Sequence, residues 1–475
     1  MLIRRLLSTT KDKFQYNPNY KFKCGLEIHT QLKTKYKLFS LSETSFNDEP
    51  NTKISYFDVG LPGTQPKLNP EALLLALKAS IALNCQIQTF SKFDRKHYFY
   101  PDQPMGYQIT QQYYPIAKDG YLELDPKLDE IEGKIGIERI QLEQDTGKKF
   151  GDIIDYNRAN TPLIEVITNP DFQNIDQVIA FIKKYQILVR HFEICSGDLE
   201  TGAIRVDVNI SVNDNPRVEI KNLGTTGDIT NALKYEYNRQ VEELERGKKI
   251  VQETKSWDGF VTKTSRSKEN MHDYRYVPDS EIPNVYLDER IGDDIKAILP
   301  EFPDEILNRL ISSPYNLQLQ HAKNLLNEPE HLNYYETFFE KLNNPEKANN
   351  WMFQELITAF AKLDQEFDVN SISPDDLVKI ANLDYSLVTK RLILKEMINS
   401  GHSIDNVIKS LNLDSEIPDV NKICEQIISQ NPEVVTRIQK GHSNAIQVLI
   451  GQAMKITKGK IKADEIKNKL MQLLK

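Results

Sequence analysis

The chain has 475 residues, a formal net charge of −8, 39% hydrophobic residues and 27% charged residues. This length exceeds a single hydrophobic core, so about two to four domains are expected, and the composition is that of an ordinary soluble protein. The acidic balance excludes a protein that coats nucleic acid through bulk charge, although a local basic patch remains compatible with it. The four cysteines form no C-x-x-C pair, which argues against a zinc knuckle or a disulfide scaffold.

The first 22 residues have the composition of a mitochondrial transit peptide. Arg4 and Arg5 lie among apolar residues that can line one face of a short helix, and the hydroxylated segment 8–10 follows. We therefore expect residues 1–22 to be a targeting segment, the alternative being a disordered basic tail. No apolar run in the chain reaches the roughly 18 residues that a membrane-spanning helix needs.

Residues 25–30 alternate as a β-strand, with Glu27 and His29 on one face and Leu26 and Ile28 on the other. A carboxylate beside an imidazole can hold a hard cation or move a proton. The same pair is also common on a solvated or hydrogen-bonded face, so by itself it leaves both readings open.

Acids among apolar neighbours recur further along the chain. Glu143 and Glu165, like Glu27, sit among apolar neighbours, which favours carboxylates that point inward. Such groups are costly to bury unless they are paired or bound to metal, and magnesium prefers oxygen ligands. The pattern is compatible with a shared metal site, but spacing in the sequence does not show whether these acids come together in the fold.

Residues 91–104 alternate basic and aromatic side chains and then contain two prolines that fix a bend. The segment can present cations to phosphate beside a stacking surface. Equally, its aromatic rings can belong to the core and its charges to the rim.

Residues 203–212 show the clearest strand alternation, and after a turn at 213–216 the segment 217–221 is expected to return as a hairpin partner. One face is apolar, and the other carries Arg205, Asp207, Asn209, Glu219 and Lys221. Helices are expected over 71–83 and 228–247. Residues 23–295 are therefore predicted to form a large mixed α/β domain with an antiparallel sheet, in an α+β chain.

Beyond Pro300 the pattern indicates helices only. Ser373 before Pro374 and Asn431 before Pro432 are helix-start signals. A linker near 410–425 is expected to divide an all-α helical domain, 296–412, from a small helical tail domain, 413–475. Residues 431–475 hold nine Lys and Arg against three Asp and Glu, a local charge of +6, which fits either an RNA-contacting face or a solvated lysine-rich face.

Two common catalytic motifs are missing from the sequence: the phosphate loop G-x-x-x-x-G-K-[ST] and the nucleophile elbow G-x-S-x-G. No cysteine has a context that marks it as a nucleophile.

From about Lys23 to Lys475 the chain resembles the B subunits of the aspartyl/glutamyl-tRNA amidotransferases, of the mitochondrial, fungal type. The motifs that carry the resemblance are G-L-E-I-H-T-Q-L at 25–32, S-K-F-D-R-K-H-Y-F-Y-P-D at 91–102, L-E-Q-D-T-G-K at 142–148, N-R-A-N-T-P-L-I-E-V at 157–166, V-E-I-K-N-L at 218–223, D-Y-R-Y-V-P-D at 273–279 and G-x-x-M-K-x-x-K-G at 451–459.

This resemblance implies a two-step reaction on misacylated tRNA. ATP phosphorylates the side-chain carboxylate of glutamate attached to glutamine tRNA, and ammonia then displaces phosphate to leave glutaminyl-tRNA. Phosphorylation supplies the leaving group that a carboxylate lacks, and Mg²⁺ with basic side chains would neutralise charge during transfer.

The resemblance also implies site residues, cofactors and partners. The implied metal site is Glu27, His29, Glu143 and Glu165; the catalytic candidates are Lys96, Glu143, Asp145 and Arg205; the candidates for ATP contacts are Arg95, Lys221 and Arg275. Lys96 would lie where ammonia meets the reaction site. The implied partners are glutamyl-tRNA(Gln), the amidase (glutaminase) subunit of the same enzyme and a small third subunit, in the mitochondrial matrix, with association to the inner membrane left open.

Two positions depart from the pattern of bacterial members, which commonly carry Lys where Met105 stands and Glu where Gln144 stands. Both departures remove a charge, one of each sign. We hypothesise that they are coupled and replace an ion pair by a neutral contact along the ammonia route, since one unpaired buried charge would be costly.

Two other functions remain as alternatives to the amidotransferase subunit. The first is a non-catalytic tRNA-binding scaffold, whose acids are only structural. The second is a stand-alone ATP-dependent carboxylate ligase that uses free ammonia and needs no partner.

Overall fold

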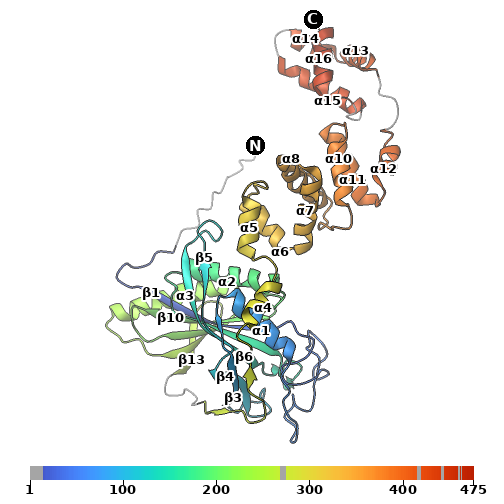
Figure 1. The fold of residues 1–475 in the computed structure, drawn as a ribbon. Coiled ribbons are helices and arrows are strands. Elements are labelled where there is room, and N and C mark those ends of the chain that lie inside the picture. Colours follow the sequence, from blue (N-terminus) through green and yellow to red (C-terminus); the bar gives the residue numbers. More distant parts are fainter. Residues whose placement is uncertain are drawn as a thin grey trace. The chain divides into compact units, whose positions relative to one another are not determined.

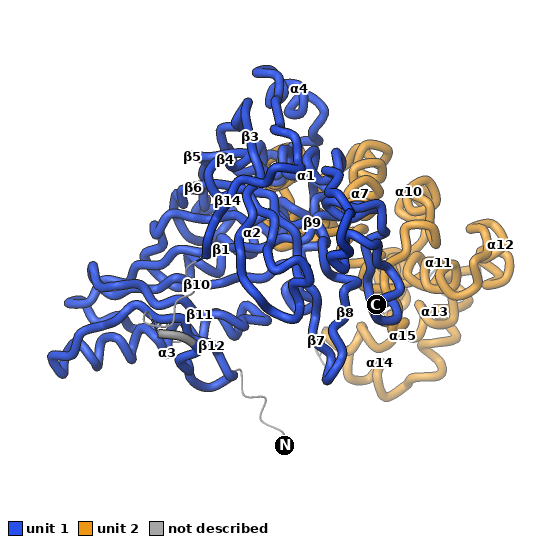
Figure 2. The backbone as a smooth tube through the Cα atoms, turned by 90° about the horizontal axis from the view of Figure 1, so that it is seen from below, with its two compact units in different colours: residues 1–305 blue, residues 306–475 orange. Residues whose placement is uncertain are grey.

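The computed structural model describes residues 14–267, 274–413, 419–439, 443–457, 461 and 463–474. The chain divides into two compact units, unit 1 ending at Glu305 and unit 2 running from Ile306 to Lys475 (Figures 1 and 2). Most of the predicted targeting segment, residues 1–13, lies outside the described residues, as does Asp273. Among the described helices, none is long and apolar enough to cross a membrane.

Unit 1 is built on a nine-stranded sheet with the order β13-β12-β11-β10-β1-β9-β6-β5-β2. Its strands are β1 (Phe22–Gln31), β2 (Gln86–Ile87), β5 (Ala117–Leu124), β6 (Gly133–Gln144), β9 (Pro162–Thr168), β10 (Ile204–Val212), β11 (Val218–Leu223), β12 (Glu253–Trp257) and β13 (Thr262–Ser267). All neighbours pair antiparallel except β11 and β12, which pair parallel. The predicted 203–221 hairpin is confirmed as β10 and β11, with Asn209 opposite Glu219.

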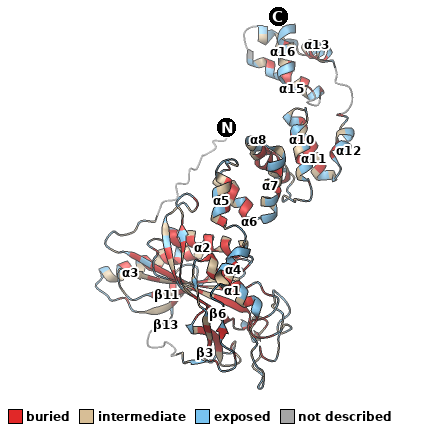
Figure 3. Cartoon of the chain, viewed as in Figure 1, coloured by how far each residue is buried: buried red, intermediate tan, exposed pale blue. Residues whose placement is uncertain are grey.

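One face of this sheet is covered by helices and the other carries the polar side chains. The helices α1 (Pro70–Ala82), α2 (Ile175–His191) and α3 (Thr226–Glu245) pack against the strands. Apolar side chains from alternate strand positions, such as Ile28 and Val208, are fully buried. Figure 3 shows buried segments along the strands and along α2. Because side chains alternate along a strand, the intervening residues of β1 and β10 point to the opposite face.

A smaller sheet lies on that opposite, polar side. It consists of β3 (Phe90–His97), β4 (Tyr107–Tyr114), β14 (Tyr276–Pro278) and β15 (Val285–Tyr286), and β4 also packs against β6. A short separate hairpin is formed by β7 (Lys148–Phe150) and β8 (Ile153–Asp155). The smaller sheet therefore covers part of the polar face of the large sheet, and a site can form between the two sheets.

The segment before β1 is part of the packed domain. Phe14 and Tyr16 join a cluster of aromatic rings with Phe22 and Tyr237, and the centroids of Tyr16 and Tyr237 lie 5.3 Å apart. The Tyr16 hydroxyl accepts a hydrogen bond of 2.8 Å from the backbone N–H of Ile175, at the start of α2. Residues 14–22 thus cover the core rather than extend away from it.

A long connection between β1 and α1 is organised around a buried ion pair. The side chains of Lys37 and Asp58 are both 0% exposed, and their Nζ and Oδ2 atoms lie 3.1 Å apart. Ser40, Ser42 and Asn160 also donate to the Asp58 carboxylate, at 2.8–2.9 Å. Since this connection is without a helix or named strand from residue 32 to 69, these polar contacts supply much of its order.

After β15 the described residues are helical. The elements are α4 (Ile291–Ile298), α5 (Pro303–Ile311), α6 (Leu319–Asn327), α7 (Pro329–Leu342), α8 (Pro345–Asn349), the π-helical segment η2 (Asn350–Leu356), α9 (Ile357–Lys362), α10 (Pro374–Asn382), α11 (Leu387–Ser400), α12 (Ile404–Ser410), α13 (Val420–Gln430), α14 (Pro432–Gln439), η3 (Ser443–Ala445), α15 (Ile446–Ile456) and α16 (Ala463–Leu473). Ser373 caps α10 as predicted, its hydroxyl accepting from the backbone N–H of Asp376 at 3.1 Å. The predicted α+β class, with helices following a sheet domain, is confirmed.

The end of the chain has its own small core. Apolar residues of α13, α15 and α16, among them Ile427, Leu449 and Leu470, pack together in one cluster. Part of the predicted linker, 414–418, and several lysines of the predicted basic tail lie outside the described residues. The division into helical domain and tail at residues 412 and 413 stays a prediction.

Candidate active site

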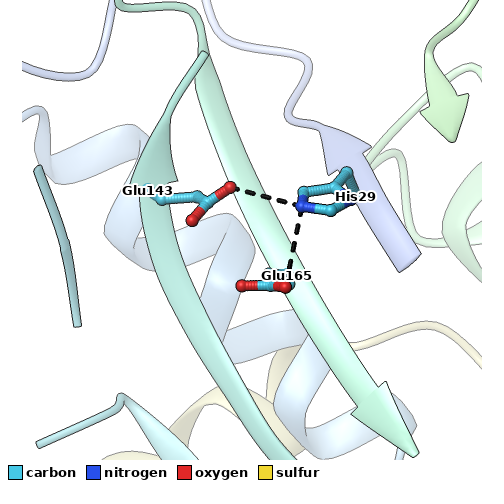
Figure 4. A group of neighbouring side chains, drawn as sticks. All are labelled: His29, Glu143 and Glu165. Atoms are coloured by element: carbon cyan, nitrogen blue, oxygen red, sulfur yellow. Dashed lines mark ion pairs between the residues drawn. The ribbon is translucent and has the colours of Figure 1, made fainter. Parts of the chain in front are cut away.

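Three side chains from three neighbouring strands of the large sheet converge on its polar face. His29 Nε2 lies 3.4 Å from Glu143 Oε1 and 3.6 Å from Glu165 Oε1. Figure 4 shows the imidazole of β1 pointing at both carboxylates. The strand register explains the meeting, because His29 is directly opposite Glu165, and Glu165 is opposite Gln141, two residues before Glu143 on β6.

Both carboxylates are held in place by neutral hydrogen-bond donors. Thr110 Oγ1 donates to Glu143 Oε2 at 3.2 Å, and Gln141 Nε2 donates to Glu165 Oε2. Glu143 is only 4% exposed, so burial raises the pKa of its carboxyl group, and the negative charge of Glu165 raises it further.

The donor set of this group fits a divalent cation. One ligand atom each from His29, Glu143 and Glu165 lie within 4.8 Å of one another. A bound positive charge would offset the burial and the negative charge of Glu165 that raise the pKa of Glu143. Carboxylate oxygens with one imidazole are acceptable ligands for magnesium, with water completing the shell. These three residues could therefore hold the Mg²⁺ that the sequence resemblance implies.

Lys96 brings a positive charge to the same place from the smaller sheet. Its Nζ lies 4.7 Å from the ring centroid of Tyr274. Burial by itself would lower the pKa of Lys96, but the carboxylates, Glu143 foremost, outweigh it and hold that pKa above its ordinary value. Lys96 is thus a cation at neutral pH, suited to contact phosphate rather than to accept a proton.

Glu27, predicted to share the metal site, lines the smaller of the two cavities described below together with His29, Glu143 and Glu165, and it also forms a second group of acids. The other members of this second group are Asp207 and Glu219, whose ligand atoms lie within 4.8 Å of one another and of that of Glu27. Lys221 Nζ contacts both of these, 2.9 Å from Glu219 Oε1, while Asn209 Nδ2 donates to Glu27 Oε1 at 2.9 Å. Lys221 supplies one positive charge to these three carboxylates, and burial, with the charge of Glu165, raises the pKa of the Glu27 carboxyl group.

Asp145 and Arg205 form an ion pair at the end of β6. Arg205 Nη2 donates to Asp145 Oδ2 at 3.0 Å, and Arg158 Nε lies 3.7 Å from the same oxygen. Burial by itself would raise the pKa of Asp145, but the two guanidinium groups outweigh it and hold the pKa below its usual range. Asp145 therefore stays ionised and positions two cations.

Two cavities meet at this site. The larger, about 660 Å³, is lined by Asp145, Arg158, Arg205 and the start of the β7–β8 hairpin; the smaller, about 330 Å³, is lined by Glu27, Glu165 and Glu219. The residues that line both cavities are His29, Lys96, Glu143 and Lys221. The chemistry-bearing groups therefore stand where two separate ligands could approach each other.

Arg95 and Arg275, the other predicted ATP contacts, line neither cavity. Arg95 neighbours Lys96 on β3 and so points to the other side of the strand, where its Nε donates to Asp279 Oδ2 at 2.6 Å. Arg275 is exposed, and its backbone carbonyl accepts from His97. Strand alternation thus separates these two arginines from the residues with which they were grouped.

Sequence reasoning missed Arg158 as a site residue, although it falls within the motif at 157–166. It also missed Asp207 and Glu219 as partners of Glu27. The sequence did predict that both residues lie on the polar face of β10 and β11. Pairing β10 with β1 would have placed them beside Glu27.

Met105 and Gln144 do lie together. Both line a small cavity of about 10 Å³ together with Asp58 and Asn160. Gln144 Oε1 is buried and has no hydrogen-bond partner among the described residues. Neither residue lines the two cavities of the site, since Gln144 and Glu143 are consecutive on a strand and point to opposite faces.

Comparison with known proteins gives two family matches. Residues 22–293 match the GatB/GatE catalytic domain, and residues 333–474 match the GatB domain. The first spans the sheet, the cavities and every predicted site residue; the second covers most of the helical unit.

Curated fungal relatives match along nearly the whole chain. A protein of Candida albicans, named as the B subunit of mitochondrial glutamyl-tRNA(Gln) amidotransferase, is 60% identical over 492 residues, which cover 100% of this chain and 99% of the relative. A protein of the same name from Lodderomyces elongisporus is 60% identical over 97% of this chain and 92% of its own length. One from Debaryomyces hansenii is 48% identical over 100% of this chain and 98% of its own length.

Proposed function

Since the chain belongs to the family of B subunits of mitochondrial glutamyl-tRNA(Gln) amidotransferases, we propose that the polar face of its large sheet carries the ATP-dependent step of glutaminyl-tRNA formation. The observation that carries the proposal is the convergence of His29, Glu143 and Lys96 where two cavities meet. The family membership favours the amidotransferase subunit over the non-catalytic scaffold.

In this proposal the chain's own residues bind and orient charged groups. His29, Glu143 and Glu165 would hold Mg²⁺, which neutralises phosphate charge and acts as a Lewis acid when bound. Lys96, a cation between the two cavities, would contact the phosphoryl group or the glutamate carboxylate. Arg205 and Arg158, fixed by Asp145, would present further positive charge to phosphate along the larger cavity.

The remaining parts of the proposal concern donors, partners and place. The names of the relatives support a multi-subunit enzyme in mitochondria. We propose ATP as phosphoryl donor, glutamine that an amidase partner hydrolyses as the source of ammonia, a small third subunit, and the matrix as location. Arg95 and Arg275 lack such support from the geometry and are left out of the proposed ATP contacts.

The test is conversion of glutamyl-tRNA to glutaminyl-tRNA with ATP, Mg²⁺ and ammonium chloride, comparing this chain alone with the chain plus its amidase partner. Product from ammonium supports the proposal. No product in either sample, although tRNA is bound, would favour the scaffold. Product from ammonium by this chain alone, with no use of glutamine gained when the amidase partner is added, would favour the stand-alone ligase.

A first prediction concerns the start of the mature chain. Since Phe14 and Tyr16 pack into the domain, cleavage within residues 14–22 would expose the aromatic ring cluster and remove the contact with α2. We expect the N-terminus of the protein isolated from mitochondria to precede Phe14, as read by N-terminal sequencing or intact mass. A mature chain that begins at residue 23 would contradict this.

A second prediction concerns Met105 and Gln144. Gln144→Glu alone would place an unpaired carboxylate in the small cavity, at a cost of about 3 kcal/mol in the free energy of unfolding, and Met105→Lys alone would place an unpaired cation there. The free energy of unfolding of the double variant, measured by denaturant unfolding, is expected to exceed the value for additive single effects by at least about 1 kcal/mol.

The same three variants test the link to the ammonia route. If the pair lines that route, glutamine-dependent activity in the complete complex will fall in the single variants and recover in the double variant, whereas activity with ammonium will change less. Additive effects on both readouts would remove the hypothesis of coupling.

A further inference from the structure

The β7–β8 hairpin stands at the rim of the larger cavity. Lys148, at its start, lines that cavity together with His29 and Glu143. Among the described strands, β7 and β8 pair with each other alone, through Lys148–Asp155, Lys149–Ile154 and Phe150–Ile153. Figure 2 shows the hairpin projecting from unit 1. Because the hairpin begins at the cavity and ends in solvent, it can contact the part of a bound ligand that extends out of the cavity.

The base of the hairpin is firmly held. Asp155 accepts hydrogen bonds from the backbone N–H groups of Asn51 and Asn157, at 3.0 and 2.9 Å. Arg158, which follows β8, donates to the carbonyl groups of Thr146 and Gly147, which directly precede β7, at 2.9 and 2.7 Å. The tip is therefore carried on a fixed support beside Asp145.

The tip exposes an apolar face with a cation next to it. The side chains of Phe150 and Ile153, directly opposite each other, are 52% and 58% exposed. Lys148, on the same face two residues before Phe150, has its Nζ 4.9 Å from the centroid of the phenyl ring. An exposed ring beside a lysine is the arrangement that proteins use to stack an unpaired base and contact its phosphate.

We propose that this hairpin receives the 3′-terminal nucleotide of the aminoacylated tRNA, with its base on Phe150 and Ile153 and a phosphate near Lys148. The inference rests on the proposed function, because a glutamyl group esterified to the terminal ribose and directed at His29 and Glu143 leaves the terminal base at the cavity rim. The hairpin thus deepens that function by assigning the contact that positions the substrate.

The test uses the complete complex and compares intact tRNA(Gln) with the same tRNA lacking its 3′-terminal nucleotide. Phe150→Ala is expected to raise the Kd of intact tRNA about tenfold and to leave the Kd of truncated tRNA unchanged, because one stacking contact is lost. Phe150→Tyr should retain binding. Phe260→Ala is the matched control, since Phe260 is 84% exposed and lies in the turn between β12 and β13.

Transamidation gives a second readout. Phe150→Ala should raise the KM for glutamyl-tRNA about tenfold and leave kcat at saturating substrate close to that of the unsubstituted enzyme. An equal effect on intact and truncated tRNA, or no effect on either, would overturn the inference. So would loss of the partner subunits from the variant in gel filtration, which would make the hairpin a protein contact.

Failure of the proposed function would look different. In that case the unsubstituted complex would itself make no glutaminyl-tRNA, whatever residue stands at 150. If the unsubstituted complex is active and Phe150→Ala behaves like Phe260→Ala, only the inference about the hairpin fails.

Discussion

Glu143→Gln is expected to lower the turnover of ATP-dependent glutaminyl-tRNA formation by about 10²- to 10³-fold, the usual effect of removing one fixed electrostatic group from an active site. Glu143 lines both cavities and contacts His29, so its charge affects the cation site and the position of Lys96 together. The substitution keeps shape and leaves an oxygen that can accept from Thr110. The measurement is steady-state kinetics with ammonium chloride as nitrogen donor.

The control for this substitution is Glu138→Gln, which lies on the same strand but is exposed. It should leave both turnover and stability unchanged. Since burial raises the pKa of Glu143, its neutral form is tolerated by the fold, and Glu143→Gln should unfold at nearly the same denaturant concentration as the unsubstituted protein. Full activity in Glu143→Gln would favour the scaffold and remove the catalytic role proposed for this residue.

Asp58→Ala should lower the free energy of unfolding by about 3–5 kcal/mol, because it leaves the buried Lys37 ammonium without its counter-ion. The expected loss is large because the same carboxylate also orders Ser40, Ser42 and Asn160. Denaturant unfolding monitors the change. Asp48→Ala is the matched control, an exposed acid in the same connection that accepts a hydrogen bond from Ser45.

The contribution of Asp58 should depend on pH in a defined direction. Burial by itself would raise the pKa of Asp58, but Lys37 and the hydrogen-bond donors outweigh it, so the pKa is lowered in the folded state. A carboxyl group with a lowered folded-state pKa stabilises the protein fully above its unfolded pKa, about 3.9, and loses that effect as the pH falls through the folded value. The stability difference between Asp58→Ala and the unsubstituted protein should therefore be constant from about pH 6 to 8 and shrink below about pH 4.

A second variant separates charge from packing at this position. Lys37→Met combined with Asp58→Leu removes both charges and is expected to be more stable than Asp58→Ala. If Asp58→Ala itself costs less than about 1 kcal/mol, the ion pair is hydrated in solution and the connection is ordered by other contacts.

The sequence was most informative where side-chain alternation acts locally. The polar face of β10 and β11, with Arg205 and Lys221, follows from a period of two along each strand, and the structure has it so. The helix that begins after Ser373 likewise depends only on a local cap.

The site itself depends on the order of strands, which local patterns do not contain. His29 meets Glu165 because β9 lies beside β1, although they are far apart in the chain. The strand order also places β10 on the other side of β1, where Asp207 is directly opposite Glu27. Sequence spacing does not contain this order, so it could not show which acids lie beside Glu27. Lys96 arrives from a different sheet altogether, and only the family motif indicated it.

The order of strands also limits how the domain can associate with other chains. One edge of the nine-stranded sheet is β2, only two residues long, and beyond it Leu83 and Asn84 occupy backbone groups of Tyr121 on β5. The other edge, β13, carries Lys263, held at 2.7 Å from Asp258. Short, covered or charged edges discourage strand addition and the aggregation that follows from it. Within the described residues, partner proteins are therefore expected to bind through side-chain surfaces rather than by extending this sheet.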